Sequence, residues 1–339
     1  MSFFRMISIL LCFKCVILLS CNHKNVTEPN IEKNKWIAIN SGLSDLHIQA
    51  LVIDAISPKI LYASTYHGIF KSNDGGDSWS LANTGMTSND VKVIRCNPEN
   101  SNQLFAGSWG DGIYISEDAA ATWKSINNGM TDLRIRSISI DSFNQENIFA
   151  ISDTKFLEST DIGTTWKEIN SPYGKLRSLS IDFGLNTEFV GTDYFGIYKR
   201  SASGSNWEAI SNGLPKEGTY STVASLQILP GTTTSILAAI RGKGVYHSQN
   251  YGQNWQLYSE DLNGIYISCM VVDNKDSDHI IVGAPQGVFM TTDGAQTWQK
   301  INNGLTNLDV RAVAIEPKDS RIIYGGTMGG GVFKMILDL

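Results

Sequence analysis

The stretch SNDGGDSW, at residues 72–79, decides how the rest of the chain is interpreted. It combines acidic residues, glycines and a terminal tryptophan in one short loop. Related stretches recur as SEDAAATW (116–123), STDIGTTW (159–166), RSASGSNW (200–207), SQNYGQNW (248–255) and TTDGAQTW (291–298). Such a loop could bind a cation, or it could be a turn that stabilises a repeated fold.

The tryptophans mark a repeat of about 43 residues. Seven of the eight are spaced by 41 to 48 residues, at Trp36, Trp79, Trp123, Trp166, Trp207, Trp255 and Trp298. Further apolar runs lie between them, for example at 48–54, 60–65 and 68–72. The runs are short, rich in β-branched and aromatic residues, and bounded by Gly, Asn and Asp, which is typical of strands joined by tight turns. Four strands in each period indicate a propeller blade.

The order of the runs predicts how the ring closes. The segment at Trp36 precedes every set of three runs, and the last set, at 310–335, has no tryptophan segment after it. We therefore predict an all-β, seven-bladed β-propeller of four-stranded blades over residues 35–339, in which the N-terminal strand completes the last blade. Because no blade buries its faces alone, the ring should form one cooperative domain.

The aspartate loop itself is expected to be structural. An Asp side chain can accept backbone N–H groups within such a turn, and Gly supplies the left-handed backbone. A calcium loop of the EF-hand type would need alternating oxygen ligands and a closing Glu, which the sequence lacks. We expect no metal and no cofactor, and a structural role for Asp74, Asp118, Asp161, Asn250 and Asp293.

The pattern S-x-D-x-G-x-[ST]-W resembles the Asp-box, or BNR, repeat over about residues 36–335. This repeat occurs in sialidases, sortilin-type receptors, xyloglucan-cleaving glycosidases and, in looser form, photosystem II assembly factors. The resemblance implies a propeller whose boxes lie on one face and whose ligands bind on the other. It implies no particular activity, because these families do not share a reaction.

Two sets of residues are expected on the face opposite the boxes. The first occupies the turns between the second and third strands, where Trp109 is the one tryptophan out of frame: Tyr66, Trp109, Asp111, Asp193, Tyr194 and Arg241. Aromatic side chains beside acids could stack on a sugar ring or contact a peptide, or they could merely cap the rim of the blades.

The second set is one column of the innermost strands, at the mouth of the channel: Gln49, Lys92, Arg136, Arg177, Ala224, Ser268 and Arg311. Four of these seven are cations, which would attract a carboxylate, a phosphate or an acidic peptide. The alternative is internal neutralisation, since Asp90 and Asp309 each lie two residues before one of the cations.

These residues favour a non-catalytic binding or assembly module for a protein or glycan ligand, which could be anionic. The alternative is a glycoside hydrolase. A sialidase-like triad of Arg136, Arg177 and Arg311 lacks a convincing Tyr–Glu partner, for which Glu217 with Tyr220 comes nearest. We expect a monomer. The net charge of −6 argues against general nucleic-acid binding.

The N-terminus resembles a lipoprotein leader. An arginine, an apolar run and Leu-Leu-Ser-Cys at 18–21 predict a signal peptide over 1–20, lipidation of Cys21 and a flexible tether over 21–34. The protein should then be exported to the bacterial cell envelope, in the periplasm or at the outer membrane, and be held on a membrane by lipid; otherwise it would be secreted. Cys96 and Cys269 are expected to be buried free thiols.

Overall fold

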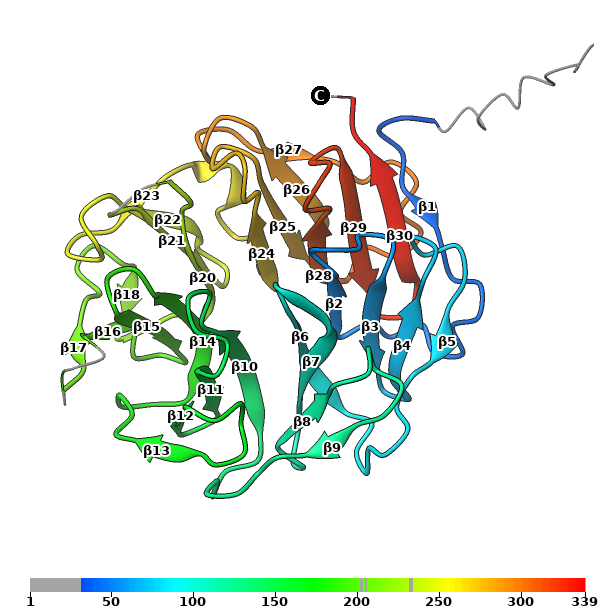
Figure 1. Cartoon of the computed structure of the whole chain (residues 1–339). Coiled ribbons are helices and arrows are strands. Elements are labelled where there is room, and N and C mark those ends of the chain that lie inside the picture. Colours follow the sequence, from blue (N-terminus) through cyan, green and yellow to red (C-terminus); the bar gives the residue numbers. More distant parts are fainter. Residues whose placement is uncertain (1–31, 202–203, 205, 232–233, 339) are drawn as a thin grey trace, which may run out of the picture. The chain divides into compact units, whose positions relative to one another are not determined.

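A computed structural model describes residues 32–338, apart from 202–203, 205 and 232–233. The predicted signal peptide, Cys21 and most of the tether lie outside the described residues. Within those residues, seven four-stranded antiparallel sheets follow one another along the chain (Figure 1). This confirms the all-β, seven-bladed propeller.

Each blade is numbered by the order of its innermost strand. The first blade comprises β2 (Ala50–Ile53), β3 (Leu61–Thr65), β4 (Gly68–Ser72) and β5 (Ser80–Leu81). The second comprises β6 (Val91–Asn97), β7 (Asn100–Ser108), β8 (Ile113–Ser116) and β9 (Lys124–Ser125). The third comprises β10 (Ile135–Ile140), β11 (Ile148–Ser152), β12 (Phe156–Ser159) and β13 (Lys167–Ile169).

The remaining blades repeat this order. The fourth comprises β14 (Leu176–Asp182), β15 (Thr187–Thr192), β16 (Ile197–Ser201) and β17 (Glu208–Ala209). The fifth comprises β20 (Val223–Ile228), β21 (Ile236–Ile240), β22 (Gly244–Ser248) and β23 (Gln256–Leu257). The sixth comprises β24 (Cys269–Val272), β25 (Ile280–Ala284), β26 (Gly287–Thr291) and β27 (Gln299–Lys300). A small hairpin of β18 (Lys216–Glu217) and β19 (Thr219–Tyr220) precedes the fifth blade, and the short 3-10 helix η1 (Glu260–Leu262) precedes the sixth.

The seventh blade closes the ring as predicted. It comprises β28 (Val310–Ile315), β29 (Ile322–Thr327), β30 (Gly331–Ile336) and, from the N-terminal end, β1 (Ile37–Ala38). Strand β1 pairs antiparallel with β30, which places blue and red strands side by side in Figure 1. The first and last parts of the propeller are thereby joined by a sheet that neither could complete alone.

The apolar core lies between neighbouring blades. The second strands of most blades are buried along all or most of their length, because the two neighbouring blades cover their two faces. Phe105 and Ile113 of the second blade, for example, pack in one cluster with Ile148 and Leu157 of the third. This packing explains why these strands are apolar runs without alternation.

The Asp boxes are local turns, as expected. The Oδ1 atom of Asp118 accepts a hydrogen bond from the Ser116 hydroxyl at 2.9 Å and from the Thr122 N–H at 2.8 Å, while Oδ2 accepts from the Thr122 hydroxyl. Equivalent bonds form around Asp74, Asp161, Asn250 and Asp293. No three His, Cys, Asp or Glu side chains among the described residues are grouped to hold a metal.

The box tryptophans fasten each blade to the one before it. The Trp166 indole N–H donates to the Ile126 carbonyl at 2.7 Å, and its backbone N–H donates to Asn128 at 2.8 Å. The intervening turn requires a glycine: Gly129 has φ of +97°, and a Cβ there would lie 2.1 Å from the Trp166 carbonyl oxygen. The recurrent Asn-x-Gly turns are therefore docking points for the next tryptophan.

Two cysteines of the described residues lie on innermost strands, Cys96 on β6 and Cys269 on β24. Cys96 and Cys269 are free, as expected, but they are half-buried rather than buried: Cys269 lies on the channel wall, and Cys96 packs against the apolar cluster between the first and second blades. Burial raises the pKa of each thiol to about 12. None of the helices in the described part of the chain is long and apolar enough to cross a membrane.

Candidate functional site

The innermost strands line a channel of about 460 Å³. The seven positions predicted to form its mouth all lie on its wall: Gln49, Lys92, Arg136, Arg177, Ala224, Ser268 and Arg311. The sequence column therefore corresponds to one physical surface. Its members come from seven different blades and meet only through closure of the ring.

The four cations of the mouth are each paired with a carboxylate. Lys92 contacts Asp90 and Gln49, and Arg311 contacts Asp309 at 2.7 Å. These are the two pairs that the sequence indicated as internal neutralisation. The other two cations, Arg136 and Arg177, pair with aspartates of the turns between the second and third strands.

Arg136 connects the two predicted sets of residues. Its Nε donates to Asp153 at 2.8 Å, and its guanidinium lies 3.8 Å from the centre of the Trp109 ring, which belongs to the preceding blade. Lys92 lies similarly over the Tyr66 ring at 5.6 Å. An aromatic side chain of one blade thus contacts a channel cation of the next, as expected for cation–π interactions. The strand turns and the channel mouth form a continuous surface.

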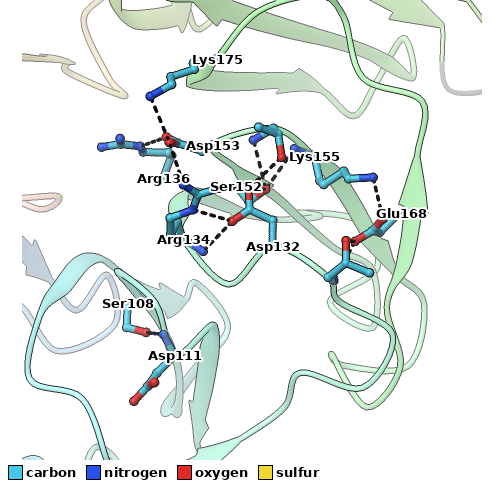
Figure 2. A network of polar contacts seen from close by, with 12 residues as sticks. Ser108, Asp111, Asp132, Arg134, Arg136, Ser152, Asp153, Lys155, Glu168 and Lys175 are labelled. Atoms are coloured by element: carbon cyan, nitrogen blue, oxygen red, sulfur yellow. Dashed lines mark hydrogen bonds and ion pairs between the residues drawn. The ribbon is translucent and has the colours of Figure 1, made fainter.

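Asp153 is the centre of a cationic cluster (Figure 2). Its carboxylate is 2% exposed and lies within ion-pair distance of Arg134, Arg136 and Lys175. Arg134 is also held by Asp132, at 2.9 Å, whereas Lys175 is mostly exposed. Trp109, Arg134, Arg136 and Lys175 are called the cationic patch below.

Asp132 illustrates how the connection between blades is fixed. It accepts the Arg134 N–H two residues further on and the hydroxyls of Ser152 and Thr154 from the neighbouring turn. Burial raises the pKa of Asp132, but the bonds from Arg134 and Thr154 outweigh this effect and lower it to about 2. In the first blade, Asp45 accepts the N–H groups of His47 and Tyr66 in the same way.

Asp193 and Arg177 form the next pair around the ring. Asp193 also accepts the Thr222 hydroxyl at 2.9 Å. Burial raises the pKa of Asp193, but hydrogen bonds from Arg177 and Thr222 prevail and the net shift is downward. Arg241 lies near enough to Asp193 to lower the pKa further.

Other predicted site residues are not brought to the channel. Asp111 accepts bonds from Thr87 and Tyr114 at the outer part of the second blade. Tyr194 is 56% exposed and has φ of +67°, so it projects from a tight turn. Tyr173, which was not singled out, packs edge-to-face on Phe195 at 4.6 Å and is 74% exposed.

The sequence interpretation missed Asp132, Arg134 and Lys175. All three belong to the connections between blades, whose lengths and sequences differ from one blade to the next. The similarity of SDLH (44–47) and TDLR (131–134), each with an aspartate that pins a turn, could have revealed the first two. Nothing comparable distinguishes Lys175.

Comparison with known proteins identifies the family of this propeller. A family model described as the DUF6242 beta propeller domain matches residues 92–308. The chain belongs to this family. No curated protein matches the sequence.

Solved structures of several propellers are similar. An ancestral GH74 enzyme has a TM-score of 0.71 and 19% identity over 88% of this chain, which spans 46% of the enzyme. YCF48 bound to D1 peptide has a TM-score of 0.70 and 14% identity, over 91% of this chain and 99% of YCF48. The extracellular domain of a hybrid two-component system from B. thetaiotaomicron has a TM-score of 0.69 and 14% identity, covering 88% of this chain and 41% of that protein. At these identities the likeness shows the fold alone.

Proposed function

We propose that this propeller is a non-catalytic binding module that captures an acidic segment of a partner protein on the face opposite the Asp boxes. The observation that carries the proposal is the cationic patch, in which three cations share the carboxylate of Asp153. A local excess of positive charge in a protein of net charge −6 attracts anionic ligands to that place.

The chemistry of the patch suits carboxylates. Guanidinium groups bind carboxylates through paired N–H donors, and the exposed part of the Trp109 ring offers an apolar contact next to them. Asp132 and Asp153 already hold the arginines in place, so ligand binding orders few side chains. A peptide ligand is supported by the solved complex of YCF48 with D1 peptide, whose propeller aligns over nearly its whole length.

A glycoside hydrolase is the second candidate, favoured by the fold shared with the GH74 enzyme. The usual mechanism requires a carboxylic acid whose pKa is raised so that it can donate a proton. Asp45, Asp132 and Asp193 have lowered pKa values instead, because each is held by hydrogen bonds. These aspartates are suited to holding cations and N–H groups, so binding is the better supported function.

Probing the protein on arrays of acidic, neutral and basic peptides, with a parallel array of glycans, tests the proposal. We expect the acidic peptides to be retained, and retention to fall as salt rises. The double variant R134Q/K175Q should lose that retention. R321Q is the matched control, because Arg321 is exposed and paired with Asp319 between β28 and β29, at the end of the blade where the boxes lie. Preference for neutral glycans, or their turnover, would support the hydrolase.

We also propose that the protein is exported, lipidated at Cys21 and tethered by residues 21–34 to a membrane of the bacterial envelope. The lipobox-like Leu-Leu-Ser-Cys supports this. Mass spectrometry of the membrane fraction should find acylated Cys21 as the first residue, and C21S should release the protein from membranes. An unmodified Cys21 in a soluble protein would reject the anchor.

A further inference from the structure

The channel contains a further cation below its mouth. Arg95 lies three residues beyond Lys92 on β6 and lines the same channel, from which it is accessible. Its guanidinium donates to the neighbouring Ile94 carbonyl at 3.0 Å. In contrast to the four mouth cations, Arg95 forms no ion pair with any carboxylate of the described residues.

The wall around Arg95 favours an anion. Every charged residue of the described chain that lines the channel is a cation: Lys92, Arg95, Arg136, Arg177 and Arg311. Serine side chains of four neighbouring strands line it as well, at Ser137, Ser178, Ser225 and Ser268. The Nε atom of Arg177 is buried and has no hydrogen-bond partner among the described residues.

The Arg95 guanidinium is accessible from the channel and has no carboxylate partner among the described residues, so it is free to bind an anion. Arginine does not lose its proton in proteins, so the charge persists and must be solvated or neutralised. The channel, at about 460 Å³, has room for a small anion and several waters, since a water takes roughly 30 Å³.

We propose that the channel binds a small oxyanion below the mouth, anchored by Arg95, with the hydroxyls of Ser137 and Ser225 as further donors within the same cavity; the Ser178 hydroxyl already donates to the Val223 carbonyl at 3.1 Å. The chemical group is a phosphate, a sulfate or a carboxylate. Arg95 does not belong to the cationic patch, although Arg136 of the patch also lines the channel, so the proposal stands whether or not the protein captures an acidic partner.

Calorimetric titration of the purified protein with sodium phosphate, sulfate and acetate, at constant ionic strength in chloride, tests the site. We expect saturable binding of at least one of these anions with one site per chain. R95Q should weaken that binding at least tenfold, whereas R95K, which keeps the charge, should retain part of it. R321Q should bind as the wild type does, because Arg321 already has its own carboxylate.

The variant R136Q distinguishes an anion bound at the mouth of the channel from one bound at Arg95. If R136Q abolishes binding and R95Q does not, the anion binds at the mouth and the proposal is wrong. Absence of saturable binding of all three anions to the wild-type protein would also overturn it. Circular dichroism of each variant checks the fold, and the wild-type titration decides the question even if one variant fails to fold. Loss of peptide retention in R134Q/K175Q with unchanged anion binding would separate the two sites.

Discussion

Asp118 and Asp153 show two different uses of an aspartate side chain, on opposite faces of the propeller. Asp118 accepts bonds from Ser116 and Thr122, which belong to its own turn. Asp153 holds three cations that come from other segments, among them Lys175 of the next connection. The first arrangement can be repeated in any blade because everything it needs is local. The second depends on which side chains the ring brings together, and among the described residues only Asp153 lies within ion-pair distance of three lysine or arginine side chains.

Backbone hydrogen bonds explain why the side chains on the face opposite the Asp boxes can differ from blade to blade. In three blades the first residue of the turn after the second strand donates its N–H to a backbone carbonyl just before the innermost strand of the same blade. The pairs are Trp109 to Asp90, Asp153 to Arg134, and Asp193 to Lys175. These bonds fix the turn whatever side chain it carries. Pro285, which has no N–H, occupies this position in the sixth blade. Side chains here can therefore be selected for binding, whereas those of the boxes are selected for folding.

Two tryptophans test this division most strongly. Trp166 is 5% exposed and holds two blades together, so Trp166→Ala should cost about 3–5 kcal/mol in the free energy of unfolding. Trp109 mainly stacks on Arg136, so Trp109→Ala should cost only about 1 kcal/mol. Denaturant titration measures both changes.

Peptide retention should show the opposite order for these two variants. Under conditions where both are folded, Trp166→Ala should bind as the wild type does and Trp109→Ala should bind weakly. Equal stability losses, or a binding loss confined to Trp166→Ala, would contradict a division between folding and binding tryptophans.

Lowering the pH should destabilise the folded protein through Asp132, on the face opposite the Asp boxes. Because its folded-state pKa of about 2 lies below the ordinary value of 3.8, its contribution of about 2 kcal/mol is present above pH 4 and is lost as the pH falls through 2. Asp132→Asn should therefore lower stability at pH 7 and flatten its decline between pH 4 and 2. Urea titrations at a series of pH values measure the slope, and an unchanged slope would show that Asp132 is not held in this way.

We expect the smallest effect on stability from a substitution within an Asp box. Asp118→Asn should retain the bonds to Oδ1, as Asn250 does with Ser248 and Asn254, and lose only the full charge at Oδ2. We expect a small drop in melting temperature and no change in peptide retention. A loss of binding in this variant would mean that the box face takes part in recognition.

The sequence predicted the fold because its determinants recur. Trp36 and its six counterparts are in register, and the missing last strand of the seventh blade identifies the N-terminal segment as its partner. The residues that line the channel mouth could also be predicted, since one aligned position of the seven innermost strands must face the axis of the ring. The pairing of Arg136 with Asp153 and Trp109 could not, because it joins three segments that share no motif. Of the three cations around Asp153, Arg136 lies on β10, whereas Arg134 and Lys175 come from two connections between blades.

The affinity of one array-selected acidic peptide, measured by fluorescence anisotropy, tests the central claim most directly. Wild type, R134Q/K175Q, Asp118→Asn and R321Q are compared at low and high salt. We predict at least a tenfold loss of affinity for R134Q/K175Q at low salt, since hydrogen bonds to charged groups contribute about 1.5–3 kcal/mol each, and wild-type affinity for the other two. Equal affinity in all four proteins would contradict the claim that the face opposite the Asp boxes binds the partner.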